Sequence, residues 1–239
     1  MTAIEKQQLY ITLATISSWA YKCPAPGFDE TPIFTDDIVS KTSCLEKIEK
    51  KIALCNRCKL CTTRTKTVSG EGVEKPLVLV IGEAPGADED LTGKPFVGKA
   101  GQLLDKMLAA ISLSRNTNCF IANIVKCRPP ANRDPLPEEI DSCSSFLQAQ
   151  IATLKPVMIL ALGRISAQVL LNTKEGIGKL RGKFFEYNKI PLMATYHPSA
   201  LLRDAQLKRP AWEDLKQFRT KLTSLIPDYE KSFNQEISR

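Results

Sequence analysis

The chain has 239 residues, of which 43% are hydrophobic and 25% are charged, and its formal net charge is +7 with a pI of about 9.0. This length suits one α/β domain, alone or with an appendage, and the composition excludes a disordered chain. No stretch is long and apolar enough to span a membrane. The positive charge favours an anionic partner, most commonly DNA, although a solvated lysine-rich surface has the same composition.

The cysteine content and the N-terminal sequence indicate where the protein works. There are eight cysteines, but a chain of this length builds a core without a disulfide framework. The N-terminus lacks the charge pattern and the cleavage site of a signal peptide. We therefore expect a cytoplasmic protein in a reducing environment, where cysteines have metal-binding or redox roles.

Residues 1–43 are predicted to be an N-terminal extension of unknown role. Four apolar residues in this extension share one face at helical spacing, and they are Leu9, Leu13, Ile16 and Ala20. A turn-rich stretch, CPAPGFDETPIF, follows them. The regular pattern begins after this stretch, so we assign residues 44–230 to one domain and residues 231–239 to a polar C-terminal tail.

Three continuous apolar runs are predicted as buried strands, at residues 76–82, 119–125 and 156–163. Continuous runs are expected where helices cover both faces of a parallel sheet. The segment KFFEYNKIPLMATYH predicts a hairpin or a fourth strand. Helical patterns lie around these strands, at residues 44–55, 100–111, 137–154, 163–171 and 211–225. The alternation predicts an α/β fold with a central, mostly parallel four-stranded sheet and helices on both faces.

Ligands of such sheets bind beyond the carboxyl ends of the strands. The sequence places three loops there: residues 82–98, residues 126–137 and the loop around His197. We therefore expect Glu83, Asn123, Asn132 and His197 to converge on one site.

Three cysteines, Cys55, Cys58 and Cys61, are separated by two residues each, a spacing at which two sulfurs reach one metal ion. Cys127 and Cys143 are the natural residues to complete a four-cysteine site. The spacing alone leaves open an iron–sulfur cluster, a structural zinc and a set of buried thiols. Cys61 is a possible substitute for any of the four ligands.

The other motifs each have a structural and a functional interpretation. GEAPG is neither a P-loop nor a dinucleotide fingerprint, and it is either a plain turn or backbone held against a flat ligand. Phe96 is a core residue by type, and it is a stacking platform only if its loop is open. Asn123 ends an otherwise apolar strand, so its amide either has a structural partner or reads a ligand. In HPSALLR, an exposed pair Leu201 and Leu202 would suit a wedge into stacked bases.

Together these motifs resemble those of the family 4 uracil-DNA glycosylases, the iron–sulfur members of the uracil glycosylase superfamily. The resemblance runs from about residue 54 to residue 203. It rests on CNRCKL, GEGVEKPLVLVIGEAPGADED, TGKPFVGKAGQLLD, ANIVKCRPPANRDPLP, the downstream Cys143 and HPSALLR, which keep the family's order and spacing. The first 43 residues lie outside it.

The resemblance implies a four-iron, four-sulfur cluster, with Cys61 left out of the ligands, which are Cys55, Cys58, Cys127 and Cys143. It implies roles near the glycosidic bond for Glu83, Asn132 and His197. It implies that uracil contacts Gly82, Ala84, Glu89, Phe96 and Asn123, with Phe96 stacking on the base, Asn123 reading it and Glu89 near its C5 edge. Contacts with DNA are expected from Arg128, Arg133, Ser199, Leu201 and Arg203.

The activity implied by the resemblance is hydrolysis of the bond between uracil and its sugar in DNA, which leaves an abasic site for repair. The expected partner is uracil-containing DNA, single or double stranded, and the expected assembly state is a monomer. Two alternatives remain at this stage. One is a non-catalytic iron–sulfur module that binds nucleic acid, and the other is a zinc-stabilised structural protein.

Overall fold

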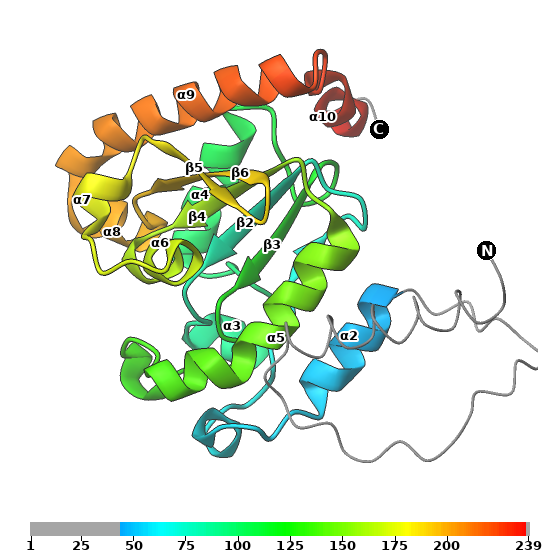
Figure 1. The fold of residues 1–239 in the computed structure, drawn as a ribbon, viewed down its shortest axis with the longest axis vertical. Coiled ribbons are helices and arrows are strands. Elements are labelled where there is room, and N and C mark those ends of the chain that lie inside the picture. Colours follow the sequence, from blue (N-terminus) through cyan, green and yellow to red (C-terminus); the bar gives the residue numbers. More distant parts are fainter. Residues whose placement is uncertain (1–43, 238–239) are drawn as a thin grey trace, which may run out of the picture. The chain divides into compact units, whose positions relative to one another are not determined.

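The computed structural model describes residues 44–237, and the predicted N-terminal extension lies outside them. The described residues form a six-stranded sheet in the order β1-β3-β2-β4-β6-β5 (Figure 1). The four central strands are parallel, and they are β3 (Cys119–Asn123), β2 (Val78–Gly82), β4 (Met158–Leu162) and β6 (Ile190–Thr195). The predicted parallel four-stranded sheet is thus confirmed.

Two short antiparallel strands extend the sheet beyond the prediction. At one edge β5 (Phe184–Tyr187) forms the expected hairpin with β6. At the other edge β1 (Glu71–Gly72) pairs with β3. A two-residue strand is too short for a periodic pattern to reveal. The pairing of β1 with β3 also brings the two backbones so close that residue 72 must be glycine, because a Cβ on Gly72 would lie 2.5 Å from the Phe120 Cα.

The continuous apolar strands supply two cores, one on each face of the sheet. Leu79 and Ile81 of β2 face a core to which α2 (Cys44–Ala53), α5 (Pro137–Leu154) and α6 (Arg164–Leu171) contribute. Val78 and Val80 face the opposite core. That core includes residues of α4 (Lys99–Ala109), α8 (Pro198–Arg203) and α9 (Lys208–Leu225). Alternate residues of one strand therefore bind both helical layers, as expected for a doubly wound sheet.

Short elements complete the described part of the chain. They are η1 (Lys59–Thr62), α3 (Ala87–Thr92), η2 (Pro130–Asn132), α7 (Ile177–Leu180), η3 (Ala205–Leu207) and α10 (Glu230–Ile237). The segment expected to be a polar tail therefore begins as a helix. Just before α10, the Tyr229 hydroxyl donates to the Ile111 carbonyl oxygen at 2.6 Å, which ties this end of the chain to α4. The boundary at residue 230 stays a prediction.

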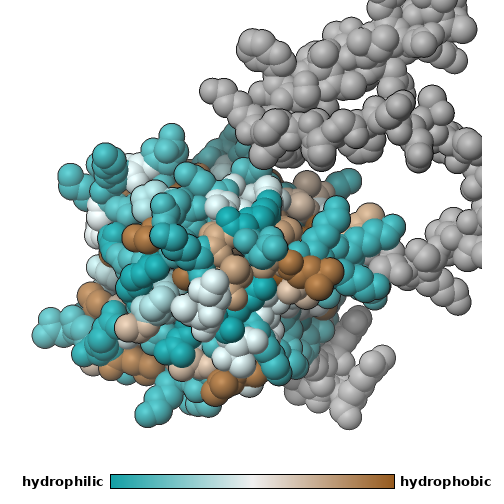
Figure 2. Space-filling view, turned by 90° about the horizontal axis from the view of Figure 1, so that it is seen from below, coloured by the Kyte–Doolittle hydropathy of each residue, from teal (hydrophilic) through white to brown (hydrophobic). Residues whose placement is uncertain are grey.

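One side chain departs from the helical pattern predicted near residue 44. The helix predicted over residues 44–55 would include Leu54, but α2 ends at Ala53 and the Leu54 side chain is 84% exposed. The face seen in Figure 2 is mostly hydrophilic, with small separated hydrophobic patches. No helix among residues 44–237 combines the length and the apolarity needed to cross a membrane.

Candidate active site and cysteine site

A pocket of about 490 Å³ lies beyond the carboxyl ends of the parallel strands. Loops that follow β2, β3, β4 and β6 contribute to it, as expected for this type of sheet. The predicted site residues that line it are Glu83, Ala84, Glu89, Phe96, Asn123, Asn132, Arg133, His197, Ser199 and Arg203. Gly82, Arg128 and Leu201 do not line it. The structure thus brings most of the predicted side chains together.

Asn123 presents an unsatisfied acceptor to this pocket. It is 1% exposed, and its Oδ1 has no hydrogen-bond partner among the described residues. Burying an amide oxygen without a partner costs about 1–3 kcal/mol, so a ligand that donates to it would be favoured. The adjacent residue on β2 is Gly82, where a Cβ would lie 2.4 Å from Asn123 Oδ1 and 2.6 Å from the Phe96 ring. Glycine is therefore required at this position for Asn123 and Phe96 to lie this close to the end of β2.

Phe96 lies at the pocket wall in an unusual backbone conformation. Its φ is +53°, a left-handed conformation that costs about 1–3 kcal/mol in a residue other than glycine. The following turn packs tightly, because a Cβ on Gly101 would lie 1.9 Å from the Phe96 carbonyl oxygen. The Phe96 ring faces the His197 ring, with centroids 5.6 Å apart and planes tilted by 33°. The Phe96 side chain is only 6% exposed, so it belongs to the core as well as to the pocket.

The carboxylate of Glu89 is held by backbone amides. Its Oε1 accepts from the N–H groups of Val97 and Gly98 at 3.0 and 3.1 Å, and its Oε2 accepts from Gly86 N–H at 3.0 Å. These bonds join the GEAPG turn to the loop that carries Phe96. The predicted contact between Glu89 and a base stays a prediction, and the structure adds a role in fixing two pocket loops.

The single histidine is set up as a neutral donor. Ser199 N–H donates to His197 Nδ1 at 3.2 Å, so the ring proton is on Nε2, which has no partner among the described residues. Burial, together with the nearby charge of Arg203, lowers the pKa of His197 to about 4. A Cβ on Gly163 would lie 2.9 Å from the His197 Cβ, so glycine is needed where β4 ends. The imidazole is therefore uncharged near neutral pH and has an N–H to offer.

Charged side chains surround Glu83 on the other side of the pocket. Burial raises the pKa of Glu83, the charge of Asp134 raises it further, and the charge of Arg164 opposes both. Arg164 and Asp134 form an ion pair at 2.5 Å. The sequence analysis missed this pair because its two residues are thirty positions apart. Asn132 accepts a hydrogen bond from Arg128 Nε at 2.8 Å, so its Oδ1 is oriented by a predicted DNA contact.

Of the predicted DNA contacts, Leu201 is not exposed as expected, while the contact of Arg133 with DNA stays a prediction. Leu201 is 3% exposed and packs in the core with residues of α4 and α9, so the expectation of an exposed leucine pair is wrong for this residue. Neighbouring helical positions point about 100° apart, and only Leu202, 51% exposed, faces solvent. Arg133 makes two bonds to the buried Glu139 carboxylate, at 2.9 and 2.7 Å, so its charge already has a partner.

Five cysteines line a second, small pocket, and they are Cys55, Cys58, Cys61, Cys127 and Cys143. All are free thiols. Among residues 44–237, no three or more metal-binding side chains already have the arrangement that a bound ion requires. Burial raises the pKa of Cys127 to about 11 and also raises the pKa of Cys143, so metal binding here must displace thiol protons. Cys61 lines the same pocket as the four predicted ligands, so the pocket does not show which four of the five cysteines would bind a metal.

The described residues that line this small pocket include three cationic side chains, Arg57, Arg64 and Lys126, and no carboxylate, although the charge of Glu139 acts on Cys58 and contributes to its raised pKa. Arg64 Nη1 donates to Cys127 Sγ at 3.1 Å, and the Lys126 backbone N–H donates to Cys143 Sγ at 3.3 Å. Such a set suits an anionic thiolate site, because buried negative charge needs a nearby cation. The sequence analysis missed both donors.

Comparison with known proteins gives the family. A family model described as the uracil DNA glycosylase superfamily matches residues 69–216. A type-4 uracil-DNA glycosylase of Archaeoglobus fulgidus is 42% identical over 181 residues, which cover 72% of this chain and 90% of that protein. Type-4 uracil-DNA glycosylases of Saccharolobus solfataricus and Thermotoga maritima are 43% and 38% identical. Their matches cover 75% and 74% of this chain, and 87% and 94% of those proteins.

These matches span the sheet, the pocket and, in the relatives, most of the protein's length. Fold and pocket together define a protein of the doubly wound α/β class, with its pocket beyond the carboxyl ends of its parallel strands. The chain belongs to the uracil DNA glycosylase superfamily, and within it to the type-4 enzymes. The resemblance noted in the sequence is thereby confirmed.

The neutral state of His197 can be tested directly, because the chain has one histidine. The pKa of about 4 lies below the ordinary 6.5, so the folded state resists protonation. The contribution to stability is complete above about pH 6.5 and is lost as the pH falls towards 4. We expect the imidazole nitrogen-15 resonances of the untagged protein to show the Nε2–H tautomer and no titration between about pH 5 and 8. The urea-unfolded chain is the control, and a midpoint near 6.5 in the folded protein would contradict the assignment.

Proposed function

We propose that this protein removes uracil from DNA by hydrolysing the bond between the base and its sugar, as a step in base excision repair. The observation that carries the proposal is the unpartnered Asn123 Oδ1, in a pocket that the Phe96 ring also lines. A flat base with a ring N–H suits this pair of side chains. The relatives that are named type-4 uracil-DNA glycosylases support the same function.

Recognition of uracil follows from the Asn123 amide. Its Oδ1 accepts from N3–H of uracil and its amide donates to O4. Cytosine presents an acceptor and a donor at the same two positions, so it is rejected. Taking a base out of a duplex costs a few kcal/mol, and stacking on Phe96 recovers about 1–3 kcal/mol of that.

Bond breaking leaves negative charge on the departing uracil and positive charge on the sugar. In the proposed mechanism, His197 Nε2–H and the backbone amides after Gly82 donate to the charged O2 of the base. A donor fixed in this way typically contributes about 3–4 kcal/mol to the transition state. Because His197 is neutral, it donates without giving up its proton, and Nδ1 remains held by Ser199 N–H.

The opposite side of the pocket is assigned to the sugar and the attacking water. Glu83 and Asp134 bring negative charge to the side where the sugar becomes cationic. Either Glu83 or Asn132 positions the water. Arg164 limits the repulsion between the two carboxylates through its ion pair with Asp134.

We further propose that Cys55, Cys58, Cys127 and Cys143 hold a four-iron, four-sulfur cluster. The donor set fits such a group, since five thiols and three cationic side chains are among the described residues that line the small pocket, and no carboxylate is among them. When bound, the cluster would supply a cross-link between the segment after α2, the loop after β3 and the start of α5. Hydrolysis of the glycosidic bond needs no electron, so the thiolates serve to hold these segments.

The partner that we propose is uracil-containing DNA, bound by a monomer in the cytoplasm. The net charge of +7 supports an anionic partner. Arg203 lies exposed at the pocket edge, and Leu202 is exposed beside it on α8, where it replaces Leu201 as the candidate wedge. Nothing in the pocket favours the non-catalytic alternative, because a module that only binds DNA needs neither a buried, unpartnered amide oxygen nor a neutral histidine.

Asn123→Asp tests base recognition. An ionised carboxylate cannot donate to O4, so release of uracil in single-turnover reactions should fall at least roughly tenfold, and weak release of cytosine becomes possible. The measurement compares matched strands that contain uracil or cytosine, after folding and iron content are checked.

The matched control for that test is Asn118→Asp. Asn118 is equally buried, but it precedes β3 at the other end and its amide bonds the Ser112 carbonyl oxygen and Ser232 Oγ. It should lower stability without changing the preference for uracil over cytosine. Wild-type uracil release by the Asn123→Asp variant would show that Asn123 is only a structural amide.

The cysteine assignment gives a separate prediction. Cys143→Ala should lose iron, visible absorbance and stability together, because formation of a metal site is coupled to folding. Cys61→Ala, in the same pocket, should keep its iron. Iron analysis and the absorption spectrum of both variants decide the matter, and the opposite result would overturn the ligand set. A colourless, zinc-containing wild type would remove the cluster and leave the proposed base recognition standing.

A further inference from the structure

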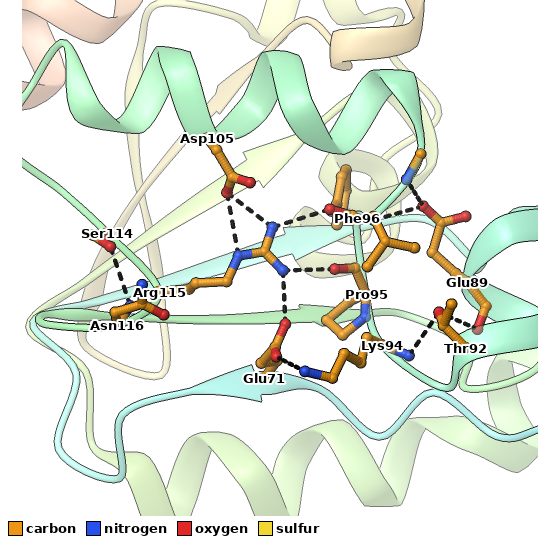
Figure 3. A network of polar contacts seen from close by, with 12 residues as sticks. Glu71, Glu89, Thr92, Lys94, Pro95, Phe96, Asp105, Ser114, Arg115 and Asn116 are labelled. Atoms are coloured by element: carbon orange, nitrogen blue, oxygen red, sulfur yellow. Dashed lines mark hydrogen bonds and ion pairs between the residues drawn. The ribbon is translucent and has the colours of Figure 1, made fainter.

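The guanidinium of Arg115 contacts the backbone beneath Phe96. Its Nη1 donates to the Pro95 carbonyl oxygen at 2.8 Å, and its Nη2 donates to the Phe96 carbonyl oxygen at 3.0 Å (Figure 3). The Arg115 side chain is 13% exposed. Two consecutive carbonyl groups of the pocket loop are therefore held by one planar group.

Two carboxylates from other elements fix that guanidinium. Glu71 of β1 accepts from Nη1 at 2.8 Å, and Asp105 of α4 accepts from Nη2 at 2.9 Å and from Nε at 3.2 Å. Every nitrogen of the guanidinium thus has a partner within the described residues. A phosphate would have to displace a carboxylate to reach this charge, so Arg115 is unsuited to contact DNA directly.

The loop needs such an anchor because of its conformation. Phe96 has a φ of +53°, and its carbonyl oxygen lies where any side chain on residue 101 would collide. Arg115 holds the carbonyl groups before and at the strained residue. Glu89 holds the amides of Val97 and Gly98, which follow it. The Phe96 backbone is therefore clamped from both sides, by a cation at its acceptors and by an anion at its donors.

We propose that Arg115 is a positioning residue for the reaction, which holds the Phe96 ring in the orientation that stacks on the extruded base. The inference rests on the proposed role of Phe96 in binding uracil. If Arg115 affects the rate through the Phe96 ring, its effect on catalysis must disappear when the ring is absent, whatever its contacts with Glu71 and Asp105 contribute to stability. A purely structural arginine would impair the enzyme equally with or without that ring.

The test is a double-mutant cycle on single-turnover release of uracil. Phe96→Ala and Arg115→Met should each lower the rate roughly tenfold, because each removes the stacked ring or its placement. In the Phe96→Ala background, Arg115→Met should change the rate by less than about twofold. Arg115→Lys keeps the charge near Glu71 but cannot span both carbonyl oxygens. Compared with Arg115→Met, it should recover more of the wild-type stability than of the wild-type rate. It also serves for the cycle if Arg115→Met does not fold.

The matched control is Arg219→Met, which removes another arginine ion pair, between Arg219 and Glu230 at 2.6 Å, away from the pocket lining. It should leave the rate unchanged. Equal losses from Arg115→Met in both backgrounds would overturn the proposal, since they indicate a general structural effect.

A second measurement does not depend on activity. In protein labelled with 4-fluorophenylalanine, the fluorine resonance of Phe96, assigned with Phe96→Leu, should shift or broaden in Arg115→Met and stay in place in Arg219→Met. An unchanged resonance in Arg115→Met would also overturn the proposal. If the wild type released no uracil, the proposed function would fail, and this resonance would still show whether Arg115 holds the ring.

Discussion

A single buried ammonium group joins the two sites of this protein. Lys126 is 1% exposed, and its Nζ donates to the Asn123 carbonyl oxygen at 2.8 Å and to Gln150 Oε1 at 2.7 Å. Gln150 in turn donates to the Ser69 carbonyl oxygen at 2.7 Å, and the Lys126 backbone N–H donates to Cys143 Sγ. Burying a lysine is costly unless its charge is compensated. Burial lowers the pKa of Lys126 to about 8, and the negative charge of a Cys143 thiolate raises it. The end of β3, the helix α5 and the cysteine site therefore meet at one residue, through its side chain and its backbone N–H.

Through this connection the cysteine site supports the proposed active site without lining its pocket. Lys126 lies between Asn123, which reads the base in the proposed mechanism, and Cys127, which follows it directly. A second connection runs through Asp90, a buried residue of α3 that accepts from the N–H groups of Thr65 and Lys66. The loop that carries Arg64 to Cys127 is thereby fixed to the helix that follows the GEAPG turn. We therefore expect a displacement of the thiols to move residues on both sides of the pocket.

The sequence predicts the parts of this arrangement that local pattern controls. Continuous apolar runs locate the four parallel strands, and chain order alone predicts that Glu83, Asn123 and His197 meet at one edge. Leu201 and Leu202 show the limit, because which of two adjacent leucines is buried depends on how α8 packs against α4 and α9. Arg115 and Lys126 were missed for a related reason. Their partners are far away in sequence, and a basic residue in a soluble protein is ordinarily assigned to the surface.

Two features of the pocket also lower the stability of the folded state. An unpartnered amide oxygen at Asn123 costs about 1–3 kcal/mol, and the left-handed backbone of Phe96 costs a similar amount, about 1–3 kcal/mol. Both persist because the apolar cores on the two faces of the sheet stabilise the surrounding fold, to which both residues belong. A base that donates to Asn123 and stacks on Phe96 would relieve the first term and use the geometry that the second maintains. A larger residue at Gly82 would not relieve either term, because its Cβ would lie 2.4 Å from Asn123 Oδ1 and 2.6 Å from the Phe96 ring and would displace both side chains.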